Sequence, residues 1–346
     1  MKLRRLAGVA LALLVLVPLA AGCGKTSSSG AGASAGGDQP MQVGLVFDIG
    51  GRGDKSFNDA AYAGLEAAQQ QLGIQFTTLE TSEGADREAQ MRQLAAGPAK
   101  LIFGVGFLFT DDIRELAKEF PDKKFACVDF TVNPGDTLPP NLVALKFKEE
   151  EGSYLVGALA ALTSKTGKVG FVGGMSIPLI KKFEAGYVAG VKAADPRATV
   201  IVKYAGNTGN AFKDPTKGKE LALAEYHAGA DVIFHASGST GLGVFEAARE
   251  LKKLAIGVDS DQYDEAPGFI LTSMVKRVDT AVLETIRAVQ EDRFMGGVQT
   301  FGLADDGVKW VYDDRNKALI PDAVKARVDT LQARIVRGEI TAPTTP

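Results

Sequence analysis

Residues 43–65 read VGLVFDIGGRGDKSFNDAAYAGL: a short apolar run, a glycine-rich turn and the start of an alanine-rich helical pattern. A strand, a turn and a helix in this order are typical of a βα unit. In an open parallel sheet, ligands bind beyond the carboxyl ends of the strands, where this turn lies. The turn offers a carboxylate (Asp48), an aromatic ring (Phe57) and an amide (Asn58). We therefore interpret it as part of a binding site without an evident nucleophile.

The same alternation of strand, turn and helix continues along most of the chain. Apolar stretches predict strands at residues 43–47, 74–79, 101–105, 124–128, 142–147, 169–172, 200–204, 232–235 and 255–258. Amphipathic stretches predict helices at residues 57–72, 86–96, 111–119, 149–164, 179–194, 215–229, 242–252, 278–292 and 321–337. This alternation predicts parallel sheets with helices on both faces. Because the pattern restarts after residue 147, the predicted fold class is α/β, with two doubly wound parallel-sheet domains.

The last part of the chain is predicted to connect the two domains again. We expect the apolar residues 269–275 to return to the first domain, and the segment after residue 299 to return to the second. The predicted first lobe is residues 41–147 plus 270–298, and the second is residues 148–269 plus 299–346. Three crossings between lobes make the fold similar to type I periplasmic binding proteins, whose usual motion is hinge closure around a ligand.

The first 40 residues predict export and anchoring. Basic residues precede an apolar run at residues 6–21, which is typical of a secretory signal over residues 1–22. Cys23 follows two small residues and resembles the lipid-bearing cysteine of a bacterial lipoprotein, although a plain signal with an incidental cysteine is the alternative. Residues 23–40 are rich in Gly, Ser and Ala and predict a flexible tether. The protein is therefore expected to be exported and lipid-anchored at a cell membrane, on the periplasmic or outer-surface side.

Composition limits the remaining function classes. The formal net charge is -3 and 45% of the residues are hydrophobic, which suits a globular body. No basic block favours nucleic-acid binding. Of the two cysteines, Cys127 lies in an apolar stretch and is expected to be a small core residue, so no disulfide is predicted.

Enzymatic and metal-site interpretations find little support. His227 falls in a predicted helix, whereas His235 ends a predicted strand, where a ligand contact and a buried hydrogen bond are comparable alternatives. The glycine spacing at residues 238–243 reverses the order of the dinucleotide motif. The acidic residues at 259–264 lack the glycine and distal glutamate of a calcium loop. No catalysis, cofactor or metal is predicted.

Four separated motifs carry a resemblance to a known family. They are DIGGRGDKSFN (48–58), FKDPTKGK (212–219), GSTGLGVFEAA (238–248) and IGVDSDQ (256–262). In this order they resemble the basic membrane lipoprotein family, which includes purine nucleoside receptor lipoproteins that serve ABC transporters. The resemblance covers roughly residues 41–310.

The resemblance also implies roles for single residues. Phe57 and Phe212 would clamp a base from opposite domains. The residues implied to contact the base or nearby polar atoms are Asp48, Asn58 and Asp129, and those implied to contact the ribose are Gly238, Asp259 and Lys276.

Structural roles remain open for the same side chains. Most of the 18 Phe must be core residues. Asp48 could cap the helix that follows it, because Asp is a common helix cap. Asp129 and Asp259 could serve turns at strand ends, and Lys276 could be a solvated charge.

The function that we predict from the sequence is that of a monomeric, lipid-anchored substrate-binding protein. It would capture a nucleoside, most plausibly a purine nucleoside, and deliver it to an ABC permease. The alternatives are a receptor of the same fold for a sugar or another small polar ligand, an exported nucleoside-cleaving enzyme, and a signalling receptor without transport.

Overall fold

The computed structural model describes residues 39–81 and 86–346. The predicted signal at residues 1–22, the predicted lipidation site Cys23 and nearly all of the predicted tether at 23–40 lie outside the described residues. Residues 40–346 form one unit, in which two α/β lobes meet. None of the helices in the described ranges has the length and apolar character needed to cross a membrane.

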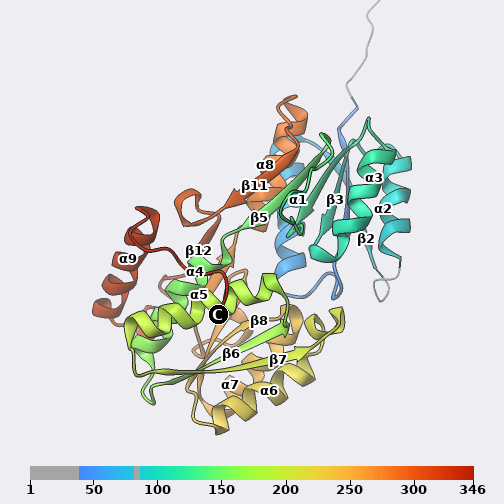
Figure 1. Ribbon diagram of the computed structural model, residues 1–346. Coiled ribbons are helices and arrows are strands. Elements are labelled where there is room, and N and C mark those ends of the chain that lie inside the picture. Colours follow the sequence, from blue (N-terminus) through green and yellow to red (C-terminus); the bar gives the residue numbers. More distant parts are fainter. Residues whose placement is uncertain (1–38, 82–85) are drawn as a thin grey trace, which may run out of the picture. The chain divides into compact units, whose positions relative to one another are not determined.

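The first lobe is built on a six-stranded parallel sheet with the strand order β11-β5-β4-β3-β1-β2 (Figure 1). Its strands are β1 (Gln42–Phe47), β2 (Gln75–Glu80), β3 (Leu101–Val105), β4 (Lys124–Val128), β5 (Leu142–Phe147) and β11 (Gly297–Phe301). Helices α1 (Phe57–Leu72) and α8 (Val278–Gln290) pack together on one face, and α2 (Arg87–Ala96) and α3 (Thr110–Glu119) cover the other. Gly64 permits the close contact between α1 and α8, because a Cβ there would lie 2.6 Å from the carbonyl oxygen of Asp279.

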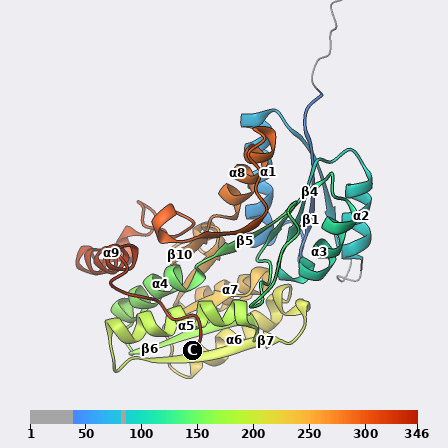
Figure 2. The same cartoon turned by 45° about the horizontal axis from the view of Figure 1, so that its top comes forward.

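The second lobe repeats this plan with the strand order β12-β10-β9-β8-β6-β7 (Figure 2). Its strands are β6 (Lys168–Met175), β7 (Thr199–Gly206), β8 (Val232–Ala236), β9 (Leu254–Asp259), β10 (Ile270–Lys276) and the antiparallel edge strand β12 (Val308–Trp310). Its helices are α4 (Glu149–Thr163), α5 (Pro178–Ala194), α6 (Pro215–His227), α7 (Gly241–Leu251) and α9 (Asp322–Val336). Helices α4 and α5 pack together on one face of the sheet, and α6 and α7 cover the other. The predicted fold class of two doubly wound sheets is confirmed.

Three short segments connect the lobes: β5 to α4, β10 to α8, and β11 to β12. They lie together, because the Lys148 N–H donates to the Phe301 carbonyl oxygen at 2.8 Å and the Arg277 N–H donates to that of Gly307 at 2.9 Å. A buried apolar cluster also continues from one lobe into the other, and it includes Phe47 of β1. The lobes are therefore joined by a narrow, hydrogen-bonded hinge.

Two predicted lobe limits are wrong. Strand β10 (Ile270–Lys276) pairs with β9 and β12 in the second sheet, so the chain does not return to the first lobe at residue 270. It returns after Lys276, when α8 packs on α1. The predicted return to the second lobe at residue 299 falls inside β11, all of which pairs with β5 in the first sheet. The first error arose because β10 is an apolar strand whose sequence suits either sheet, and the second arose because the mostly exposed β11 was not predicted as a strand at all.

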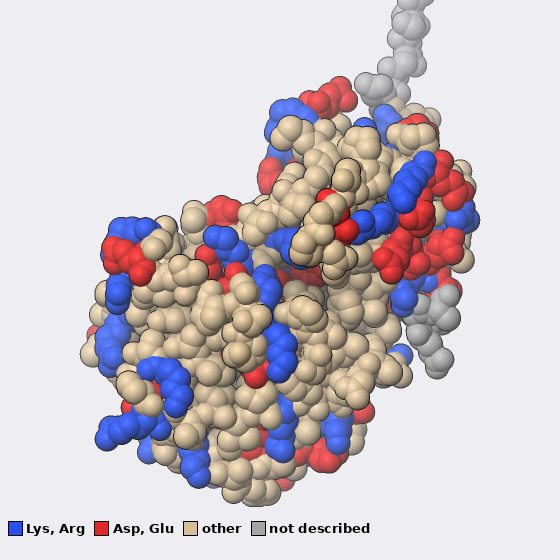
Figure 3. All heavy atoms as spheres, in the orientation of Figure 1, with Lys and Arg blue, Asp and Glu red and all other residues tan. Residues whose placement is uncertain are grey.

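Acidic and basic side chains lie interspersed over the face seen in Figure 3. Many of them form exposed pairs along single helices, such as Lys118 with Glu115 on α3 and Lys325 with Asp329 on α9. Such surface pairs contribute little to stability, about 0–1 kcal/mol each. Buried charged groups have larger effects on stability than these exposed pairs.

Glu225 on α6 is one of these buried charges. It is fully buried, and neither carboxyl oxygen has a hydrogen-bond partner within the described part of the chain. Burial raises its pKa from 4.5 to about 9. The folded-state pKa therefore lies above the unfolded one. The stability contribution of this group is complete below about pH 4.5 and is lost as the pH rises through about 9.

We expect Glu225→Gln to stabilise the protein at about pH 8 relative to about pH 4.5, because the amide has no charge to lose. The gain should grow by up to about 1.4 kcal/mol per pH unit within this window. Urea denaturation of both proteins across the pH range measures it. Glu220→Gln, at an exposed position on the same helix, is the matched control and should show no such trend. A Glu225→Gln difference that is flat with pH would contradict the expectation.

Candidate functional site

A cavity with about 580 Å³ of empty space, including its opening to solvent, lies between the lobes. Its wall comes from the carboxyl ends of strands in both sheets and from the first turns of α1 and α5. All eight residues predicted as ligand-binding from the sequence line it: Asp48, Phe57, Asn58, Asp129, Phe212, Gly238, Asp259 and Lys276. The further lining residues are Ile49, Asp54, Gly106, Phe107, Leu179, Ile180, Phe183, Ala236, Ser237 and Val258.

The turn after β1 is shaped by Asp54, which the sequence analysis did not single out. Its carboxylate accepts hydrogen bonds from the backbone N–H groups of Ser56, Asn58 and Asp59. Asp54 therefore holds the start of α1, and the alternative that Asp48 caps this helix is wrong, because the Asp48 carboxylate accepts from the N–H of Ile49 at 2.7 Å. The signal was present in the sequence as an Asp shortly before the helix.

Asn58 lines the cavity, but much of its amide is used within this turn. Its Oδ1 accepts from the backbone N–H of Asp48 at 3.0 Å, and its Nδ2 donates to Asp54 at 3.1 Å. The side chain is 2% exposed. Asn58 therefore ties the end of β1 to the start of α1 and keeps Asp48 in the wall.

Phe57 and Phe212 enter the cavity wall from opposite lobes. Phe57 is the first residue of α1, and Phe212 ends the short 3-10 turn Gly209–Phe212. Both rings are half-buried. The ring of Phe107, which the sequence analysis missed, lies 6.4 Å from that of Phe212 at an interplanar angle of 65°. Gly174 leaves space for the Phe212 ring, because a side chain at that position would clash with it.

Lys276 lies at the centre of the buried charges. Its Nζ is 2.6 Å from Asp129 Oδ2 and 3.1 Å from Glu149 Oε1, and its side chain is 1% exposed. The rings of Phe57 and Phe147 lie 5.1 Å and 5.0 Å from the same nitrogen. Burial alone would lower the pKa of Lys276, but the carboxylates of Asp129 and Glu149 outweigh it and raise the pKa above its ordinary value. The alternative of a solvated lysine is wrong.

Two further carboxylates in the wall have shifted pKa values. Burial raises the pKa of Asp48 from 3.8 to about 7, although the hydrogen bond from Ile49 opposes this. Burial also raises the pKa of Asp259 to about 6, against the opposing effects of Lys276 and of Ser56. Ser56 Oγ donates to Asp259 Oδ2 at 2.6 Å, across the two lobes. These carboxylates change their charge near neutral pH.

The open question about His235 is resolved in favour of a buried hydrogen bond. The ring is fully buried and does not line the cavity. Its Nε2 lies 3.1 Å from Gln262 Oε1, and its Nδ1 lies 3.3 Å from Ser237 Oγ. Burial lowers the pKa of His235 to about 4, so the ring is neutral at physiological pH. His227, the last residue of α6, is exposed, and Cys127 is a buried core residue.

The wall therefore combines aromatic faces from both lobes with carboxylate oxygens that accept hydrogen bonds. An ionised carboxylate accepts but does not donate, and an aromatic ring stacks on a flat partner. The arrangement suits a small ligand with a planar part and several hydrogen-bond donors. Among the described residues that line the cavity, no side chain is arranged as an activated nucleophile.

Comparison with known proteins agrees with this geometry. Residues 41–345 match the sequence profile of a family described as "ABC transporter substrate-binding protein PnrA-like". The chain belongs to this family. A CD4+ T-cell-stimulating antigen of Listeria innocua is 37% identical over 99% of each chain. An ABC transporter nucleoside-binding protein, BmpA, of Lactococcus lactis is 32% identical over 98% of this chain and 99% of its own. A solute-binding protein structure from Aeropyrum pernix covers 88% of this chain and 94% of its own, with 29% identity and a TM-score of 0.78.

Membership of the PnrA-like family confirms the resemblance seen in the four sequence motifs. It also confirms the prediction of a substrate-binding protein rather than an enzyme, because the family consists of binding proteins. The protein is an ABC transporter substrate-binding protein with a cavity between two lobes.

We expect Lys276→Met to destabilise this PnrA-like protein by about 3–5 kcal/mol, because it leaves the buried carboxylate of Asp129 without its cation and Glu149 with Lys182 as its remaining basic partner. Urea denaturation measures the loss. Lys317→Met, which breaks the exposed pair with Asp314, should change stability by less than about 1 kcal/mol. Equal effects of the two substitutions would show that the buried ammonium group has no special role.

Proposed function

We propose that this protein is a lipid-anchored receptor that captures a purine nucleoside between its lobes and delivers it to an ABC permease. The main support is that Phe57 and Phe212 line one cavity from opposite lobes, with carboxylates in the same wall. The name of the Lactococcus lactis relative, a nucleoside-binding protein, points to the same ligand class.

In the proposed complex the flat base lies between Phe57 and Phe212. Each aromatic partner contributes about 0.5–1.5 kcal/mol beyond the apolar area that it buries. Asp48 and Asp129 face the polar edges of the base from the first lobe, with Asn58 holding Asp48 in place. A purine N–H or amino group donates to these carboxylates, which only accept when ionised.

The ribose is assigned to the second lobe. Asp259 accepts hydrogen bonds from the sugar hydroxyls, and Gly238 lets the chain come close because it has no side chain. The φ of Gly238 is 56°, and a Cβ there would lie 2.9 Å from the carbonyl oxygen of Phe212. Lys276 contacts the sugar while its charge is balanced by Asp129 and Glu149.

The remaining parts of the proposal concern the cell surface. Cys23 is proposed to carry the lipid that holds the protein on the outer side of the membrane, and residues 23–40 to act as its tether. The receptor is proposed to act as a monomer and to present both lobes to the permease after closure. Closure brings the loops of both lobes together around the ligand.

We expect Phe57→Ala and Phe212→Ala each to weaken inosine binding at least about tenfold, and the double variant to abolish it, because a stacking surface is lost on each side of the base. Isothermal titration calorimetry with inosine measures the affinity. Phe76→Ala, at a half-buried phenylalanine of β2 outside the cavity, is the control. If the double variant binds a free sugar as the wild type does while inosine fails to bind either protein, the receptor is a sugar receptor instead.

We expect inosine affinity to rise with pH up to about 6 and then to flatten, because a hydroxyl that donates to Asp259 favours the ionised carboxylate. Asp48 extends the rise towards about 7 if the base donates to it. Titrations of wild type and Asp259→Asn measure both curves, and the variant should bind more weakly with a shallower dependence near pH 6. Stronger wild-type binding at lower pH would contradict this assignment.

A further inference from the structure

Gln262 ends the motif at residues 256–262, and it has no part in the proposed ligand contacts. Its side chain is 2% exposed, and both ends of its amide are used. Oε1 accepts from the backbone N–H of Val258 at 2.8 Å, and Nε2 donates to the carbonyl oxygen of Lys55 at 3.0 Å. Because an N–H can only donate and a carbonyl can only accept, these two contacts decide how the amide is oriented. Val258 belongs to the second lobe and Lys55 to the first, so Gln262 bridges the lobes.

The same amide oxygen orders the cavity wall. Gln262 Oε1 accepts, so the neutral ring of His235 must carry its proton on the facing Nε2. Its Nδ1 is then an acceptor, and it receives the hydroxyl proton of Ser237 at 3.3 Å. Ser237 lines the cavity. With its proton used inside the wall, this hydroxyl offers the ligand acceptor lone pairs.

On the opposite lobe, Gln262 holds the turn that leads into Phe57. Lys55 has a φ of 56°, which is unusual for a residue other than glycine. Next to this bond, Ser56 Oγ donates to Asp259, and Ser260 Oγ donates to the carbonyl oxygen of Ser56 at 3.1 Å. Gln262 differs from the other residues in these contacts between the lobes. It holds the turn that leads to Phe57 and, through His235, it also orients Ser237 of the cavity wall.

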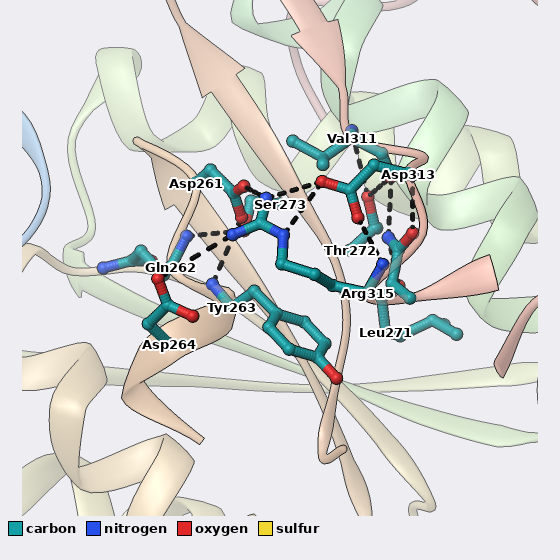
Figure 4. A network of polar contacts seen from close by, with 11 residues as sticks. Asp261, Gln262, Tyr263, Asp264, Leu271, Thr272, Ser273, Val311, Asp313 and Arg315 are labelled. Carbon is teal, nitrogen blue, oxygen red and sulfur yellow. Dashed lines mark hydrogen bonds and ion pairs between the residues drawn. The ribbon is translucent and has the colours of Figure 1, made fainter. Parts of the chain in front are cut away.

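The C-terminal segment contacts the loop that carries Gln262 and holds it in place (Figure 4). The Arg315 guanidinium lies between Asp261 and Asp313 and is 5.4 Å from the centre of the Tyr263 ring. The backbone N–H of Gln262 donates to Ser273 Oγ of β10 at 3.0 Å. The bridge between the lobes therefore starts from a loop that is itself held in place.

We propose that Gln262 is the positioning residue that couples closure of the lobes to the hydrogen-bonding state of the cavity wall. It acts through Lys55 on the turn that presents Phe57, and through His235 on Ser237. This inference deepens the proposed function and rests on it for the identity of the ligand. The coupling of the lobes itself is independent of that identity.

The decisive variant is Gln262→Glu in the full-length protein. It keeps the shape and the acceptor towards Val258, but it places a carboxylate oxygen against the Lys55 carbonyl oxygen, so closure is opposed. Stopped-flow measurements with inosine should show dissociation that is at least about tenfold faster, with association changed less than about threefold. Because the new carboxylate replaces a buried amide, the melting temperature of each protein is measured as well, and the rate constants are compared at a temperature at which both proteins are folded.

Two further variants control for loss of folding and for the general effect of a new charge. Gln262→Met removes both the donor to Lys55 and the acceptor for Val258 and His235 without adding a charge, and it should speed dissociation in the same direction by a smaller factor. Gln290→Glu is the control for an added charge at an exposed position, because Gln290 Nε2 also donates to a backbone carbonyl, that of Leu72, at 3.0 Å, but within the first lobe. It should leave both rate constants unchanged.

Small-angle X-ray scattering separates failure of this inference from failure of the proposed function. Gln262→Glu should have a larger radius of gyration than wild type and Gln290→Glu under identical conditions, whether or not inosine binds. If wild type does not bind inosine, the proposed function fails. The role of Gln262 between the lobes is then tested by the radius of gyration alone. If dissociation and radius of gyration are both unchanged in Gln262→Glu, or if Gln290→Glu changes them equally, Gln262 does not couple the lobes.

Discussion

The arrangement of the lobes depends on the ion pairs that the ammonium group of Lys276 forms with Asp129 and Glu149. Lys276 stands at the end of β10, where the chain leaves the second sheet, and it pairs with Asp129 at the end of β4 in the first. Glu149, at the first crossing, contacts it from the start of α4 and also pairs with Lys182 of α5 at 2.5 Å. Removing such charges from water costs several kcal/mol per ion, so they are tolerated only when they stay together. A displacement of one crossing would separate them. The buried charges therefore align the carboxyl ends of both sheets on one cavity.

This constraint also explains why the wall is suited to holding a ligand. The cavity carries the carboxylates of Asp48, Asp54 and Asp259 beyond those that Lys276 balances. Asp54 is satisfied by backbone N–H groups, and Asp259 accepts one hydrogen bond from Ser56. The acceptor capacity that remains in the wall is available to a ligand that carries hydrogen-bond donors.

Periodicity predicted the elements well because local pattern decides them. Strands β1, β3 and β4 begin or end within a residue of their predicted limits, since each is a short apolar run between turn signals. Strand β10 was predicted in the wrong lobe, because its sequence suits any buried strand and a local pattern does not reveal its pairing with β9 and β12. The site residues at strand ends follow from topology. Phe183 was missed because it lies on helix α5, and nothing in a helical pattern says which face will meet a cavity. Lys276 entered the predicted site through family resemblance, since its partners Asp129 and Glu149 are far from it in sequence.

Within the described residues, few hydrogen bonds join the loops of the two lobes, and this matters for a transport receptor. Ser56 with Asp259, Ser260 with Ser56 and Gln262 with Lys55 are hydrogen bonds that each contribute about 0.5–1.5 kcal/mol net, somewhat more where a charge takes part. Together they supply only a few kcal/mol. A bridge of that size biases the lobes towards closure without locking them. A ligand with equal affinity for the open and closed forms would not shift the equilibrium between them. The rest of the preference for the closed form must therefore come from contacts that a ligand makes with both lobes at once. Aromatic rings on opposite lobes can provide such contacts.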